Sequence, residues 1–148
     1  MKKYDNYCEI VFDAVSENEH FARMVVSGFV VQLDPTIDEL NELKTAVSEA
    51  VTNSIIHAYD NRGGKIKMTL GYKDNDVDVT VTDYGKGIDN INQARELFYT
   101  TRPEEERSGM GLTIIEAFSD EFYISSKPNE GTTIKIRKTF LANYINYA

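Results

Sequence analysis

The sequence predicts an α+β fold of two layers, in which a mixed, mostly antiparallel sheet carries its helices on one face. Two segments with apolar residues spaced by three and four indicate amphipathic helices. Two later segments alternate apolar and polar residues, which indicates antiparallel strands with one buried face. All 148 residues are expected to form one domain, with a core over about 8–140 and a tail at 141–148.

The first strand is predicted in CEIVFDAV, residues 8–15, and a helix follows it directly. Ser16 and Glu19 have the spacing of a capping box, which marks the start of a helix. Four apolar residues spaced by four predict the buried face of this helix: Phe21, Val25, Phe29 and Leu33.

Thr36 and Glu39 repeat the capping box and predict the start of a second helix. Its expected core face falls within roughly 60° on a helical wheel. That face consists of Leu40, Leu43, Val47, Val51, Ser54 and Ala58. The DNRGG run then ends the helix.

The rest of the chain predicts a hairpin, a long loop, a helix and two strands. Alternation over 66–72 and 77–81, around the turn KDND, indicates the hairpin. Residues 84–111 show no sustained apolar periodicity and predict a long loop. A loop of that length in a compact domain is usually functional. The closing elements are a helix at 111–120 and strands at 121–126 and 132–138.

Charge and composition restrict the possible partners and location. The chain has 24 acidic and 16 basic residues, a net charge of -8, which argues against nucleic acid or an anionic membrane as the main partner. The longest apolar run, at 24–33, is about half the ~20 residues that span a bilayer. Cys8 is the only cysteine, and we expect a cytoplasmic protein without disulfides.

A polar row interrupts the second predicted helix. Glu49, Asn53 and His57 are spaced by four, so they share one helix face at the edge of the core. A carboxylate and a carboxamide one turn apart can offer oxygen atoms to a hard cation. The row is therefore either a solvated flank or the wall of a site.

Asp83 ends the strand that carries Val77, Val79 and Val81, and alternation directs it to the same buried face. A carboxylate there needs a partner. Gly85 and Gly87 follow at once, so a ligand with an amino group could approach closely. The alternative is a local turn in which Asp83 caps backbone amides.

Two further motifs have a functional and a plain structural interpretation. Gly109 and Gly111 open a predicted helix, where unpaired N–H groups favour an anion such as phosphate, although simple turn chemistry uses the same residues. Thr132 shares the inner face of the last strand with Ile134 and Ile136. It is either part of a site or an ordinary β-branched strand residue.

Taken in order, ExxxN on a helix, DxGxG after a strand, GxG before a helix and GTT at a strand start form a specific set. The set resembles the nucleotide-binding fold of DNA gyrase, histidine kinases and the mismatch-repair ATPase, called the GHKL or Bergerat fold. Residues 16–59 and 96–121 also look like the anti-sigma factors of endospore-forming bacteria that hold sigma-F inactive. This similarity spans about 9–138.

The resemblance implies a Mg-ATP site and assigns a role to each matching residue. Asn53 would coordinate Mg²⁺ and Glu49 would be the general base on a serine hydroxyl, while Asp83 would accept from the adenine amine. The other implied nucleotide-binding residues are Gly85, Gly87, Arg107, Ser108, Gly109, Met110, Gly111 and Thr132.

The resemblance also implies partners. Such proteins form homodimers, bind a sigma factor in the ATP state and phosphorylate a serine of an anti-anti-sigma protein, and Arg23 would lie on the surface used by these partners. Three alternatives remain open: the related kinase of the general stress sigma factor, a binding module that uses ATP only as a switch, and the ATPase domain of a sensor histidine kinase.

Overall fold

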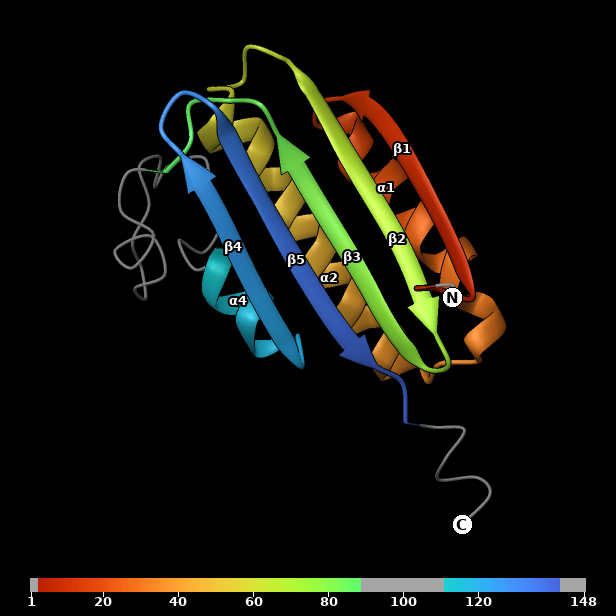
Figure 1. Ribbon diagram of the computed structural model, residues 1–148. Helices are drawn as coiled ribbons and strands as arrows, with labels where there is room; N and C mark the ends of the chain where they lie inside the picture. The colour runs from red at the N-terminus through yellow and green to blue at the C-terminus, as the bar shows by residue number, and fades with distance from the viewer. Residues whose placement is uncertain (1–2, 89–110, 142–148) are drawn as a thin grey trace.

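A computed structural model describes residues 3–88 and 111–141, which form two layers (Figure 1). One layer is a five-stranded sheet with the order β1-β2-β3-β5-β4. The strands are β1 (Asn6–Asp13), β2 (Lys65–Lys73), β3 (Asp76–Asp83), β4 (Glu121–Lys127) and β5 (Gly131–Thr139). Every pairing among these strands is antiparallel, so the described sheet is antiparallel throughout rather than mixed.

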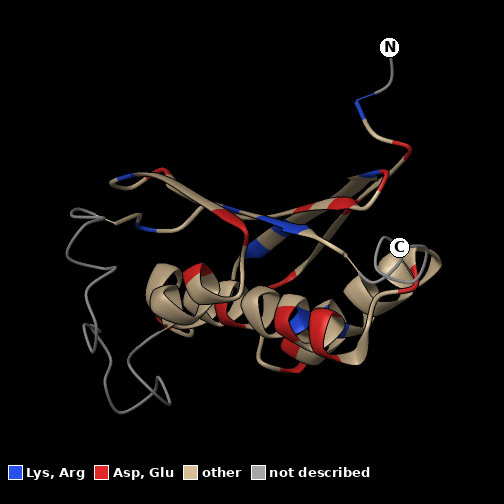
Figure 2. Ribbon diagram, turned by 90° about the horizontal axis from the view of Figure 1, so that it is seen from below, with Lys and Arg blue, Asp and Glu red and all other residues tan. Residues whose placement is uncertain are grey.

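The second layer contains the helices, which lie on one face of the sheet as predicted (Figure 2). They are α1 (Glu17–Val30), the short 3₁₀ helix η1 (Val31–Leu33), α2 (Ile37–Asn53), the π-helix η2 (Ser54–Ala58) and α4 (Gly111–Ala117). Helix α2 is in contact with both α1 and α4. It runs behind the central strands and ends near the C-terminal end of β3 (Figure 1).

The predicted cap of α1 is wrong, and its predicted core face is only partly right, because Val25, Phe29 and Leu33 are half-buried against the core. The Ser16 side chain makes no capping hydrogen bond, because its hydroxyl donates to the carboxylate of the adjacent Glu17 at 3.0 Å. The fully buried face is one residue later than predicted and consists of Ala22, Val26 and Val30. Small side chains allow the close packing of α1 on its neighbours, whereas Phe21 remains 45% exposed.

The predictions for α2 are confirmed in its α-helical part. The Thr36 hydroxyl accepts from the N–H of Glu39 at 3.1 Å, and the Glu39 carboxylate accepts from the N–H of Thr36 at 3.0 Å. These two bonds satisfy two of the unpaired donors at a helix start. The predicted core residues Leu43, Val47 and Val51 are fully buried.

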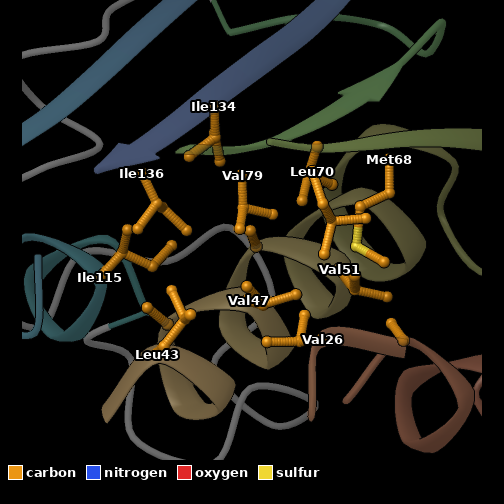
Figure 3. Close-up of a cluster of buried hydrophobic side chains, with 14 of the residues drawn as sticks. Val26, Leu43, Val47, Val51, Met68, Leu70, Val79, Ile115, Ile134 and Ile136 are labelled. Atoms are coloured by element: carbon orange, nitrogen blue, oxygen red, sulfur yellow. The ribbon is translucent and has the colours of Figure 1, made fainter. Parts of the chain in front are cut away.

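The core lies between α2 and the sheet (Figure 3). Met68 and Leu70 of β2, with Val79 of β3, face Val47 and Val51 of α2. Burial of each such side chain contributes about 1.5–3 kcal/mol. This core holds the end of α2 against the end of β3, where the polar motifs meet.

None of the helices in residues 3–88 and 111–141 is long and apolar enough to cross a membrane.

The capping box can be tested with Thr36→Ala and the matched variant Ser16→Ala. Loss of the Thr36 hydroxyl removes the acceptor of the Glu39 N–H, so the free energy of unfolding should fall by about 1 kcal/mol. Ser16→Ala should have a smaller effect, because that side chain makes no capping bond. Urea denaturation followed by circular dichroism measures both, and equal losses would contradict the assignment.

Candidate functional site

Asp83 is the last residue of β3 and is only 5% exposed. Its Oδ1 accepts hydrogen bonds from the backbone N–H groups of Gly85 and Thr132, both at 3.1 Å. Its Oδ2 accepts from the hydroxyl of Ser54 at 3.0 Å. The carboxylate thus joins the end of β3 to the start of β5 and to the end of the α2 helix.

Of the two interpretations left open for Asp83, the local one is present, because the carboxylate accepts from the backbone amides of Gly85 and Thr132. Alternation along a strand shows the direction of a side chain, but not the donors that a turn and a facing helix bring to it. Burial raises the pKa of the Asp83 carboxyl, while the hydrogen bonds from Gly85, Ser54 and Thr132 act in the opposite direction. A carboxylate oxygen can accept two hydrogen bonds, and the described residues supply only one to Oδ2.

Ser54 reaches Asp83 from the first turn of a π-helix. The α-helix ends at Asn53, and the N–H of Tyr59 donates to the carbonyl of Ser54 at 3.1 Å, five residues back. Such wider turns are common at functional sites. The sequence contained a signal, because Ser54 was the hydroxyl among the predicted core positions of this helix.

The segment after β3 is packed between η2 and the β4–β5 turn. The N–H of Lys86 donates to the carbonyl of Ala58 at 3.1 Å, and a side chain at Gly85 would come within 2.4 Å of the same oxygen. Gly87 has a φ of 77°, and its added Cβ would lie 2.2 Å from the Lys127 carbonyl oxygen. These glycines therefore accommodate the chain's own backbone.

Two hydroxyl groups that sequence reasoning missed help to hold this segment. The Tyr59 hydroxyl accepts from the N–H of Tyr84 at 2.7 Å and lies 2.6 Å from the Lys65 carbonyl oxygen. On the other side, Ser126 Oγ accepts from the N–H of Ile88 at 2.8 Å and lies 2.7 Å from Thr132 Oγ1. No sequence motif marks either residue, since both act across distant elements.

The polar row on α2 is half-buried, with Glu49 one helical turn before Asn53. His57 lies in the π-helix, so the regular spacing of the predicted row ends at Asn53. Within the described ranges, no three His, Cys, Asp or Glu side chains form a cluster that could hold a metal ion. The carboxamide oxygen of Asn53 is a ligand type that a hard cation accepts.

The remaining predicted site residues fall into two groups. Arg107, Ser108, Gly109 and Met110 lie outside the described residues, and the buried Gly111 is the first residue of α4, as predicted. Arg23 of α1 is half-buried, and its Nε is buried with no hydrogen-bond partner among the described residues. Thr132 is buried on the inner face and paired with Asp83 across β3 and β5.

Comparisons with known proteins show the family of this chain. Residues 12–138 match the family model for the histidine kinase-like ATPase domain. The chain is 53% identical over 134 residues to the anti-sigma F factor of Anoxybacillus flavithermus, covering 90% of this chain and 92% of the relative. This chain belongs to the anti-sigma F factor family of histidine kinase-like ATPase domains.

Other family members and solved structures extend the similarity. The anti-sigma F factor of Clostridium beijerinckii is 53% identical over 137 residues, with 92% of this chain and 96% of the relative covered. The structure of the RsbU and RsbW domains of Rv1364c from Mycobacterium tuberculosis has a TM-score of 0.66 at 20% identity. The match covers 91% of this chain and 32% of the Mycobacterium tuberculosis chain. The nucleotide-free catalytic domain of the histidine kinase ThkA has a TM-score of 0.56 at 16% identity, covering 91% and 96%. These two structures show the common fold.

The raised pKa of Asp83 gives a pH-dependent prediction for Asp83→Asn. An Asn side chain can keep all three hydrogen bonds if its amide donates to Ser54. Stability from a raised folded pKa is present at low pH and is lost as pH rises through that pKa. The variant should therefore unfold at or above the wild-type temperature at neutral pH, and this advantage should shrink as the pH falls to about 3.

Asp78→Asn on the same strand is the matched control with the opposite sign. Asp78 is equally buried, which opposes ionisation, but hydrogen bonds from Arg137 and Tyr4 hold its pKa below the usual value. This variant should unfold at a lower temperature than wild type near pH 7, with a difference that narrows in acid. Melting temperatures from about pH 3 to 8 measure both, and the same sign for the two variants would contradict the account.

Proposed function

We propose that this protein is an anti-sigma factor that binds the sporulation sigma factor sigma-F and uses Mg-ATP to phosphorylate a serine of an anti-anti-sigma protein. The observation that carries the proposal is the buried Asp83 carboxylate, which accepts a hydrogen bond at the end of α2. The chain that carries it is 53% identical to an anti-sigma F factor.

Asp83 suits the adenine amine, because its Oδ2 accepts one hydrogen bond from the described residues and a carboxylate oxygen can accept a second. The other two hydrogen bonds fix the carboxylate to the backbone of Gly85 and Thr132. Gly87 and the Thr132 side chain lie on the same end of the sheet and would border the base. A preorganised acceptor of this kind favours a ligand with an amino donor.

Asn53 and Glu49 are the residues proposed for the reacting end. Bound Mg-ATP supplies the phosphoryl group, and its transfer depends mainly on positioning and neutralisation of charge. The Asn53 carboxamide oxygen would be one ligand of Mg²⁺. Glu49 would accept the proton of the partner's serine hydroxyl, a role worth about 10²–10⁴-fold in rate.

The other predicted nucleotide contacts are part of the same proposal. Gly85 would lie beside the base, and the phosphates would be held by the helix start and the residues before it. Those residues are Arg107, Ser108, Gly109, Met110 and Gly111. Arg107 would contact the terminal phosphate or the protein substrate.

The partner surface is proposed to include Arg23 on α1. Its side chain is only half-buried, so part of it is open to a bound protein. Acidic residues gather on the helical layer, which suits a partner with basic groups rather than nucleic acid or an anionic membrane (Figure 2). We further propose a cytoplasmic homodimer that binds the sigma factor with ATP in place.

Glu49→Gln tests the kinase part of the proposal. The amide cannot accept the serine proton, so incorporation of labelled phosphate into the anti-anti-sigma serine should fall by about 10²–10⁴-fold. Binding of Mg-ATP and of the sigma factor should persist. Glu42→Gln on the same helix is the control and should keep activity, because its partner is Lys138 at 2.9 Å.

An unchanged phosphorylation rate in Glu49→Gln would refute the assignment of Glu49 as the base. Wild-type protein that binds ATP and sigma-F but yields no phosphoserine would favour a binding module that uses ATP only as a switch.

A further inference from the structure

Ser54 is a buried hydroxyl at the junction of α2 and η2, and it is only 3% exposed. Its Oγ lies 3.0 Å from Asp83 Oδ2 and 3.4 Å from the carbonyl oxygen of Ala50. A serine hydroxyl has one proton to donate, and the shorter contact to a charged acceptor is the stronger one. The proton of Ser54 therefore goes to Asp83, and the contact with the helix backbone is secondary.

The two oxygens of Asp83 have different surroundings. Oδ1 accepts from two backbone N–H groups, one in the following turn and one on β5. Oδ2 accepts from Ser54, and the part of the chain that the structure describes gives it no other donor. The hydrogen bond from Ser54 fixes the rotation of the carboxylate plane. It therefore also fixes the direction in which the remaining lone pair of Oδ2 can accept a second hydrogen bond.

We propose that Ser54 is a positioning residue that aims the Asp83 carboxylate at the exocyclic amine of adenine. This inference rests on the proposed function and adds a determinant of base specificity to it. Ser54 acts through Asp83 alone, so its hydroxyl should matter for a purine that carries the amine and not for one that lacks it. Its effect should appear in nucleotide binding rather than in the transfer of the phosphoryl group.

A purely structural role for Ser54 predicts a different outcome. In that case the hydroxyl would only tie η2 to the sheet, and its loss would weaken binding of any nucleotide through a looser fold. Ser48 provides the comparison, since it is on the same helix, is 8% exposed and places its Oγ 2.6 Å from a Glu19 carboxylate oxygen of α1. Ser48→Ala removes a similar tie that does not involve Asp83.

The experiment is calorimetry of three proteins: the wild type, Ser54→Ala and Ser48→Ala. Each is titrated in the presence of Mg²⁺ with ATP and, separately, with purine riboside triphosphate, an analogue that has hydrogen in place of the exocyclic amine. Ser54→Ala should bind ATP roughly 5- to 20-fold more weakly, as expected for loss of a charge-assisted hydrogen bond. Its affinity for the analogue should change less than about twofold. Ser48→Ala should change both affinities by less than about twofold, and melting temperatures establish that all three proteins are folded.

Kinetics give a second readout that a loosened fold would not reproduce. Ser54→Ala should raise the KM for ATP by a factor similar to the loss of affinity, while kcat stays within about twofold. The reason is that the lost interaction stabilises the bound substrate and the transition state equally, and the contacts made only in the transition state remain.

The binding measurements with ATP and the analogue separate failure of the role of Ser54 from failure of the proposed function. Equal losses for ATP and the analogue in Ser54→Ala, or no loss for either, would overturn the role of Ser54 while wild-type ATP binding still stood. A wild-type protein that binds neither nucleotide would refute the proposed function, and this inference with it.

Discussion

A carboxylate buried at the end of the central strand is the constraint on which this end of the molecule depends. A buried ionised group is tolerated only when hydrogen bonds replace water. Asp83 obtains them from three directions: the turn after β3, the neighbouring strand β5 and the end of the long helix. Because each donor comes from a different element, satisfying this one group fixes the helix, the sheet and the following segment relative to one another.

The opposite end of the two layers is held by contacts that are purely structural. Lys138, 7% exposed, lies on the inner face of β5 and joins the Glu42 carboxylate to the carbonyl oxygen of Phe118 after α4. Glu39 caps α2 and also accepts from the N–H of Leu141. All these polar groups are satisfied by one another. The Asp83 end differs, because there the carboxylate keeps an acceptor position and its donor Ser54 directly follows Asn53 of the polar row.

Local signals explain what the sequence could predict. The Thr36 capping box, the central core positions of α2 and the alternation of the strands depend on neighbours within a few residues, and they appear in the structure. The outer predicted positions Leu40 and Ala58 are only half-buried. The face of α1 was misjudged because large side chains were favoured over Ala22, which packs closely. Asp83 was found as a buried carboxylate, but its bond to Ser54 was not, since it needs a π-turn that no spacing indicates.

Calorimetry of wild type and Asp83→Asn with Mg-ATP tests most directly the proposed bond between the Asp83 carboxylate and the adenine of ATP. The Asn side chain can keep the three internal hydrogen bonds but presents an amide donor to the adenine amine. We predict wild-type binding and at least about a tenfold loss in the variant, with its melting temperature preserved. Equal affinities in the two folded proteins would contradict the account.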